Sequence, residues 1–253
     1  MLPRRVVISG ASSGIGEALA RYYASPEATL GLISRRPGPS GLPGTVVHYA
    51  VDVTDAEAVS TISKDYVSRF GAPELVIANA GISAGTSSEA IEDVAKLRAV
   101  LEVNVAGLAA TLAAFAPAMR KAGRGTLAGI ASVASFRGLA GNGAYSASKA
   151  AARVWMESLR AELYGSGVSV VCVCPGYIDT PLTRINRFHM PFLISAEAAA
   201  PKIARAIAAR RRVAVIPWQM ALVSIPLRLM PDWLFDRLAS RAPRKPRGMG
   251  TEP

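Results

Sequence analysis

The feature that most constrains the fold is a glycine-rich turn near the N-terminus. A short apolar run at residues 6–9 is followed by Gly10, Gly14 and Gly16, and apolar residues then recur at helical spacing from Glu17 onward. Such a turn between a strand and a helix lets backbone amides approach a pyrophosphate, because unpaired N–H groups and the helix dipole attract an anion there. The chain is therefore predicted to open with a nucleotide-binding α/β unit.

A second feature predicts acid–base chemistry. Tyr145 and Lys149 are four residues apart, so they share one face of a helix, and Ser132 lies upstream of them. At roughly 4 Å and an effective dielectric constant near 20, the ammonium would favour the phenolate by about 4 kcal/mol, or about 3 pKa units. This pair is expected to bring the pKa of Tyr145 towards neutrality, although the same spacing also occurs on ordinary solvated helices.

With Asn79-Ala80-Gly81 after an apolar strand, these motifs resemble the short-chain dehydrogenase/reductase family. The glycine spacing is Gly-x-x-x-Gly-x-Gly, not the commoner Gly-x-Gly-x-x-Gly, and the resemblance extends from about Arg4 to about Pro217. It implies an α/β fold with a Rossmann-type, doubly wound parallel sheet, and an oxidoreductase acting on CH–OH and C=O groups. The alternating strand and helix signals, with 51% apolar residues, predict a single domain over residues 1–253.

The resemblance assigns cofactor-binding residues position by position. The turn that would cradle the phosphates comprises Gly10, Ser12, Ser13, Gly14, Ile15 and Gly16. Further cofactor contacts are expected at Asp52, Val53, Asn79, Ala80, Gly81, Tyr145, Lys149, Pro175, Gly176, Ile178 and Thr180. Asp52 is also a candidate for capping a helix that begins near Asp55.

Two arginines predict which nicotinamide cofactor is used. An acidic residue at the end of the second predicted strand, Thr29 to Ser34, would repel a 2′-phosphate, but this chain has Arg35 and Arg36 there. A guanidinium offers phosphate oxygens a planar fork of donors and stays charged. NADP(H) is therefore predicted in preference to NAD(H), with Arg35 as the main phosphate ligand. The alternative is that one or both arginines, Arg36 above all, are merely solvated.

By the same resemblance, the catalytic residues are Asn104, Ser132, Tyr145 and Lys149. Tyr145 is expected to protonate the carbonyl oxygen as hydride leaves the nicotinamide, and Ser132 to hydrogen-bond the same oxygen. Lys149 is expected to lower the pKa of the tyrosine and to hold the nicotinamide ribose. Asn104 is expected to maintain a water relay to the lysine, with an amide turned to a backbone carbonyl as the alternative.

The C-terminal third predicts a hydrophobic substrate and a separate apolar segment. The predicted substrate loop, residues 178–194, is rich in apolar side chains. A strongly apolar extension at residues 217–241, broken by Pro226 and Pro231, precedes a basic tail at residues 242–253. Because a large apolar surface needs a partner, the extension is expected to cover the pocket or form a subunit contact, with a membrane surface as the alternative.

Charge and cysteine content limit other functions. The net charge of +11 comes from local clusters, such as Arg210-Arg211-Arg212, without a recognisable binding fold or aromatic interleaving, so nucleic-acid binding is not predicted. Cys172 and Cys174 are expected on opposite faces of the predicted strand 168–173, as buried apolar side chains. No metal site is predicted.

The remaining expectations concern assembly and location. The alanine-rich stretch at residues 103–119 is interpreted as a buried or subunit-facing helix, not a membrane span, and a homodimer or homotetramer is expected from the resemblance. Since the N-terminus runs directly into the first predicted strand, we expect no signal peptide and a cytoplasmic protein, with membrane association through the C-terminus as an alternative. The competing functions are a non-catalytic NADP-binding sensor or scaffold, and a peripheral membrane-associated ketone reductase for lipid-like substrates.

Overall fold

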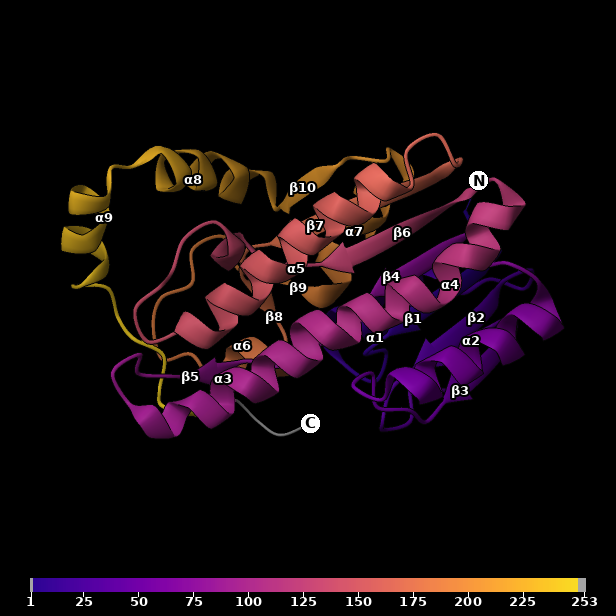
Figure 1. Ribbon diagram of the computed structural model, residues 1–253, viewed down its shortest axis with the longest axis horizontal. Coiled ribbons are helices and arrows are strands. Elements are labelled where there is room, and N and C mark those ends of the chain that lie inside the picture. The colour runs from indigo at the N-terminus through magenta and orange to yellow at the C-terminus, as the bar shows by residue number, and fades with distance from the viewer. Residues whose placement is uncertain (1, 250–253) are drawn as a thin grey trace.

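Seven parallel strands form the central sheet in the computed structural model, which describes residues 2–249 (Figure 1). Their order across the sheet is β10-β7-β6-β4-β1-β2-β3. The strands are β1 (Arg5–Ser9), β2 (Thr29–Ile33), β3 (Thr45–Tyr49), β4 (Leu75–Ala78), β6 (Gly125–Ile130), β7 (Val168–Pro175) and β10 (Val213–Ile216). The order reverses direction beside β1, which is where doubly wound sheets open a crevice for a ligand.

Helices cover both faces of the sheet, because the inner strands are apolar on both sides. Val6 and Ile8 of β1 face one core, and Val7 between them faces the other. The first core is covered by α1 (Gly14–Tyr23) and α7 (Ala196–Ala208). The second core is covered by α2 (Ala56–Phe70), α4 (Leu108–Ala122) and α5 (Gly143–Glu162). The predicted single-domain, Rossmann-type doubly wound fold is confirmed.

One helical run, Ile91–Ala122, is long and apolar enough to cross a membrane by length and composition. It consists of η1 (Ile91–Asp93), α3 (Val94–Leu101), the π-helical turn η2 (Glu102–Gly107) and α4. In the fold it lies against the sheet, where Leu112, Phe115 and Met119 are buried in the second core. The run is therefore a layer of the domain, as the sequence predicted, and a subunit contact on its outer side stays a prediction.

The C-terminal segment leaves the central sheet and ends in a separate two-stranded sheet. After β10, helices α8 (Trp218–Leu229) and α9 (Asp232–Ala239) form a bent arm at the edge of the molecule (Figure 1). The chain then runs back to the domain, where β11 (Gly248–Met249) pairs antiparallel with β5 (Ala84–Gly85). The described part of the basic tail is thus attached to the domain. Residues 250–253 of that predicted tail lie outside the described residues.

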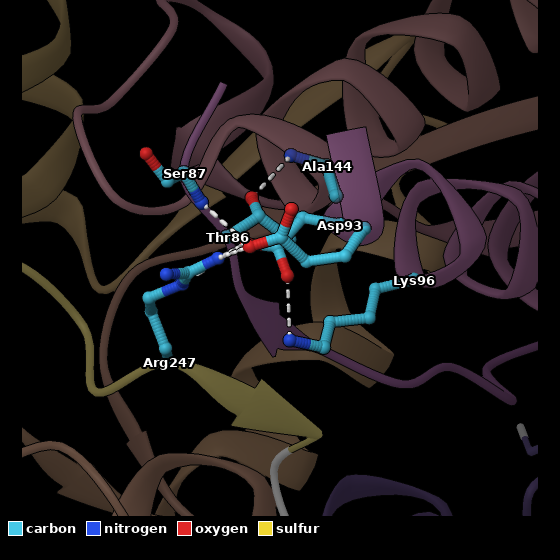
Figure 2. A network of polar contacts seen from close by, with 7 residues as sticks. Thr86, Ser87, Asp93, Lys96, Ala144 and Arg247 are labelled. Carbon is cyan, nitrogen blue, oxygen red and sulfur yellow. Dashed lines mark hydrogen bonds and ion pairs between the residues drawn. The ribbon is translucent and has the colours of Figure 1, made fainter. Parts of the chain in front are cut away.

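A buried carboxylate holds the returning tail (Figure 2). Asp93 Oδ2 accepts hydrogen bonds from the Ser87 amide at 2.7 Å and from Arg247 Nη2 at 3.1 Å, and its Oδ1 accepts one from Lys96 Nζ at 2.6 Å. Hydrogen bonding to Lys96, above all, lowers the pKa of Asp93 to about 2. The sequence analysis treated Arg247 only as part of a basic tail, and the structure adds that a carboxylate 154 residues earlier in the chain binds it.

We expect Asp93→Asn to release the tail. The neutral amide cannot compensate two cations, so amide hydrogen exchange in residues 84–88 and 244–249 should accelerate on the order of tenfold or more. Because the pKa of Asp93 is lowered from 3.8 to about 2, the carboxylate stabilises the fold above about pH 4, and this contribution is lost as the pH falls towards 2. Glu89→Gln, on an exposed acid of the same loop, is the matched control. Equal exchange in both variants would contradict the role given to Asp93.

Candidate active site

The glycine turn is built by close packing between β1, α1 and the end of β4. Gly10 and Gly14 have φ values of +67° and +56°, which side chains rarely allow. At Gly16 a Cβ atom would collide with the carbonyl oxygen of Gly10, so only glycine lets α1 begin this close to the strand. Asn79 Nδ2 donates to the carbonyls of Ser9 and Gly10, both at 3.1 Å, and so ties β4 to the turn. The N-terminus of α1 is thereby aimed at the crevice.

A cleft of about 590 Å³ opens at the carboxyl ends of the strands. Of the predicted cofactor residues, 18 line it: Gly10, Ser12, Ser13, Gly14, Ile15, Arg35, Arg36, Asp52, Val53, Asn79, Ala80, Gly81, Tyr145, Lys149, Pro175, Gly176, Ile178 and Thr180. Gly16 does not line the cleft, because it lies behind the turn and allows the packing described above. The cleft, its glycine cradle and the helix N-terminus fit a nicotinamide dinucleotide.

The cleft also has walls that the sequence did not single out as cofactor contacts. They come from residues close in sequence to the predicted ones: Ile33, Ser34, Pro37, Val51, Ile82, Val103, Ile130, Ala131, Pro181, Leu182 and Thr183. Ile82 directly follows the Asn79-Ala80-Gly81 motif and Val51 precedes Asp52, so proximity to a motif was an available signal for both. Val103 directly precedes Asn104, so the same signal was available for it.

Ser132, Tyr145 and Lys149 meet at one end of the cleft. Tyr145 and Lys149 project from α5, and Ser132 follows β6, where its hydroxyl accepts a hydrogen bond from the Ala134 amide and begins the turn η3 (Val133–Ser135). All three residues line the cleft. Tyr145 is half-buried and the other two are buried. The structure therefore brings these three predicted catalytic side chains together.

The electrostatics of this group differ from the sequence-based expectation. Burial raises the pKa of Tyr145 above its ordinary value, and a hydrogen bond to the Ser132 side chain acts in the opposite direction. Lys149 Nζ donates to the carbonyl oxygen of Ile130 at 2.8 Å and lies 5.8 Å from the centroid of the tyrosine ring. The expected shift of the tyrosine towards neutrality was wrong for this arrangement, because the ammonium bonds to Ile130 and desolvation dominates. Burial lowers the pKa of Lys149 to about 8.

Asn104 is fully buried in the π-helical turn η2 and does not line the cleft. Its Oδ1 accepts from the Ile82 amide at 2.8 Å, and its Nδ2 donates to the Ile82 carbonyl and to Ser148 Oγ, both at 2.9 Å. The side chain thus bonds to backbone, which is the alternative the sequence left open, and it links the loop after β4 to α5. A water relay to Lys149 stays a prediction.

At the other end of the cleft, Arg35 reaches Asp52, with 3.6 Å between Nη1 and Oδ2. Asp52 also accepts hydrogen bonds from the amide and hydroxyl of Thr54. The suggestion that Asp52 caps the next helix was wrong, since Asp55 is the N-cap of α2 and accepts from the Ala58 amide at 2.9 Å. Asp52 therefore holds a loop and orients Arg35 at the cleft.

The predicted substrate loop contains short secondary-structure elements that are held by local hydrogen bonds. It contains β8 (Ile178–Asp179), α6 (Pro181–Arg184) and β9 (Ile194–Ser195). Thr183 and Thr180 form a capping box that begins α6, and Pro181, Leu182 and Thr183 line the cleft. Arg184 pairs with Asp179 at 2.8 Å, so its guanidinium is engaged within the loop.

Beneath the site lie the two cysteines, and their predicted orientation was wrong. Side chains two residues apart on a strand point to the same face, and the Sγ atoms of Cys172 and Cys174 are 3.8 Å apart in the second core. Both are buried, as expected. Within residues 2–249, no group of three or more His, Cys, Asp and Glu side chains is placed to hold a metal ion.

The fold and site define a Rossmann-type nucleotide-binding oxidoreductase, and comparison with known proteins specifies the family. A sequence model described as "short chain dehydrogenase" matches residues 4–189. An uncharacterized oxidoreductase of Myxococcus xanthus is 37% identical over 246 residues, covering 94% of this chain and 97% of that protein. The chain therefore belongs to the short-chain dehydrogenase/reductase family, whose members act on CH–OH and C=O groups and bind nicotinamide nucleotides.

Two further proteins show the range of similarity. The 11-beta-hydroxysteroid dehydrogenase 1A of Arabidopsis thaliana is 35% identical over 193 residues, covering 72% of this chain and 54% of that protein. Among solved structures, the alcohol dehydrogenase of Thermococcus sibiricus complexed with 5-hydroxy-NADP has a TM-score of 0.70 at 27% identity, covering 83% of this chain and 94% of the other.

We expect Lys149→Met to stabilise the protein in the absence of nucleotide. With the pKa of Lys149 lowered from 10.5 to about 8, charging it at pH 7 costs the fold about 3 kcal/mol, against about 1 kcal/mol for the lost hydrogen bond. The free energy of unfolding in urea at pH 7 should thus rise by about 2 kcal/mol. In the wild type, the free energy of unfolding should increase between pH 8 and 10.5, because in this range Lys149 is protonated mainly in the unfolded chain.

The control for this substitution is Lys121→Met, on an exposed lysine of α4, which should change stability by no more than about 0.5 kcal/mol. If Lys149→Met destabilised the protein at pH 7, the ammonium would have a better partner than the Ile130 carbonyl.

Proposed function

We propose that the protein is an NADP(H)-dependent oxidoreductase that transfers hydride between the nicotinamide and the carbonyl or secondary alcohol of a hydrophobic substrate. One observation carries this proposal. Ser132, Tyr145, Lys149 and Arg35 line a single cleft, and β4 and β1 separate β6, which precedes Ser132, from β2, which precedes Arg35. Such an arrangement suits a ligand whose reactive ring and ribose phosphate are far apart.

The chain's own residues supply the proton and orient the reacting oxygen. When bound, the nicotinamide supplies or accepts the hydride. The hydroxyl of Tyr145 donates its proton to the developing alkoxide, and Ser132 donates a second hydrogen bond that holds the same oxygen. In the reverse direction the tyrosine oxygen takes the proton back. A phenol with a raised pKa stays protonated near neutrality, which suits the acid role in reduction.

Lys149 and Asn104 support Tyr145 without transferring the proton themselves. The Lys149 amine is buried within the cleft wall and can donate to a ribose hydroxyl, while its bond to the Ile130 carbonyl fixes its position. Asn104 positions α5 through Ser148, whose hydroxyl in turn donates to the Tyr145 carbonyl at 2.8 Å. Asn104 is therefore assigned a positioning role for the helix that carries both catalytic side chains.

Arg35 supports the choice of NADP(H). Its side chain lines the cleft and is about half exposed, and its guanidinium is 3.6 Å from Asp52. The guanidinium can therefore rotate towards a 2′-phosphate while the residue stays part of the cleft wall. Arg36 also lines the cleft. The Thermococcus sibiricus enzyme was solved with an NADP derivative, which agrees with this proposal.

The apolar loop supports a hydrophobic substrate. Ile82, Ile178 and Leu182 all line the cleft, and Tyr177 packs edge-on against Phe188 with ring centroids 6.2 Å apart. The similarity to a plant hydroxysteroid dehydrogenase points in the same direction. A non-catalytic sensor would have no need of Ser132, Tyr145 and Lys149 grouped at one site, so it is the less supported function.

We expect Tyr145→Phe to abolish turnover while leaving nucleotide binding intact. Loss of the acid should reduce kcat by about 10²- to 10⁴-fold in NADPH-dependent reduction of medium-chain, aromatic and steroid-like ketones and aldehydes. The matched control is Tyr164→Phe, on a tyrosine that is 90% exposed. NADPH binding without turnover by the wild type on the whole panel would favour the sensor function.

A second variant tests the cofactor preference. Arg35→Ala should weaken NADPH binding by roughly 10- to 100-fold, the value of a charge-assisted hydrogen bond, and change NADH binding little. Titrations followed by nucleotide fluorescence would measure both affinities. Arg120→Ala, on an exposed arginine of α4, should change neither. A wild type that binds NADH more tightly than NADPH would refute the assignment of Arg35.

A further inference from the structure

Helix α8 exposes its apolar side to solvent. Four apolar side chains on one stripe are largely exposed: Trp218 at 68%, Leu222 at 59%, Ile225 at 53% and Leu229 at 78%. Their spacing of four, three and four residues places them on one face of the helix. The side facing the domain carries Met220 and Ser224, which are 4% and 5% exposed. An ordinary surface helix has the reverse pattern, so the stripe is built to meet an apolar partner.

Helix α9, which follows α8 in the arm, carries a further exposed tryptophan and a cation. Trp233 is 69% exposed, and Arg237, one turn later, shares its face and is also exposed. Together with the stripe on α8, these two residues form what we call the arm surface. Tryptophan suits a boundary between apolar and aqueous media, because its indole is apolar with one polar N–H group.

The charge around the arm surface is positive. Residues 217–247 contain six cationic side chains, at Arg228, Arg237, Arg241, Arg244, Lys245 and Arg247, and two acidic ones, at Asp232 and Asp236, which gives six minus two, or +4. Asp232 pairs with Arg137 at 2.9 Å. Lys245 and Arg247 face the domain through Ser83 and Asp93. Arg244 packs against Gly141, and Arg228 lies 4.9 Å from the ring centroid of Phe136. The exposed cations Arg237, in α9, and Arg241, directly after it, are the ones left at the arm surface.

The arm is attached firmly beside the active site. Arg137 Nη2 donates to the Met230 carbonyl and to Asp232, and its guanidinium lies 4.3 Å from the ring centroid of Phe235. At the base of the arm, Met220 packs so closely on Gly176 that a Cβ there would lie 2.5 Å from Met220 Cγ. The arm surface is therefore presented by a structured element whose base touches the wall of the cleft.

We propose that the arm surface is a docking site for an anionic lipid bilayer. Exposed tryptophans at two points of an apolar surface, bordered by arginines, match the interfacial region of a bilayer with negative headgroups. The net charge of +11 adds long-range attraction to such a surface. A second copy of the chain would bring the same arginines together, which opposes self-association through this face. The proposal does not depend on which reaction the cleft performs.

The test is co-sedimentation of the full chain with vesicles of phosphatidylcholine containing about one quarter phosphatidylglycerol. We expect the wild type to pellet with these vesicles and to pellet at least roughly tenfold less with phosphatidylcholine alone. Leu222→Glu combined with Leu229→Glu should reduce pelleting by roughly tenfold or more. The matched control, Ile91→Glu with Tyr164→Glu, adds the same charge at side chains that are 84% and 90% exposed elsewhere, and should pellet at close to the wild-type level.

A second pair of variants adds no charge. Trp218→Ser with Trp233→Ser changes two exposed side chains, so it should keep the wild-type circular dichroism and melting temperature and still lose pelleting. The proposal is overturned if the wild type stays in the supernatant with anionic vesicles, or if either arm variant pellets as the wild type does. A subunit interface would give a different result. Light scattering would then show a wild-type dimer that does not bind vesicles and that becomes a monomer in the arm variants, and this result would also overturn the proposal.

Discussion

The close approach of α1 to β1 is the constraint on which the site depends. With no side chain at Gly16, the carbonyl of Gly10 can lie against the helix, and Asn79 fixes that carbonyl from the end of β4. The first helix therefore begins at the point where the strand order reverses, with its unpaired amides facing the crevice. A methyl group at Gly16 would separate strand and helix and move every cofactor contact of the turn.

The catalytic end of the cleft illustrates a conflict between stability and function. Lys149 is buried with a lowered pKa, so the fold holds an ammonium where burial disfavours charge. Hydrogen bonds stabilise this part of the site. The Ile130 carbonyl accepts a hydrogen bond from Lys149, and the Asn104 side chain links Ile82 to Ser148 of α5. The π-helical turn that carries Asn104 interrupts an otherwise α-helical run at the place where that amide must reach the loop.

In the C-terminal segment, the fold separates the apolar side chains from some of the cationic ones, which alternate along the sequence. Its composition is a mixture of apolar and cationic residues, and composition alone does not say which of them face the domain. In the fold, Lys245 and Arg247 turn inward and fasten the tail, while Trp218, Leu229 and Trp233 face outward. Polar and charged contacts therefore fasten the tail to the domain, while the apolar side chains of α8 and α9 face solvent.

By itself the sequence determined the fold class, the glycine turn, the Tyr145–Lys149 pair and most of the cleft, because these depend on short-range spacing and on alternating strand and helix signals. It also contained the information that Cys172 and Cys174 share a face, since side chains on a strand alternate with a period of two residues. Only the tertiary structure decided that Lys149 bonds to Ile130, that Asn104 bonds to Ile82 and that Arg247 reaches Asp93. These contacts join residues 19, 22 and 154 positions apart, and local spacing does not specify which distant polar group will satisfy a buried one.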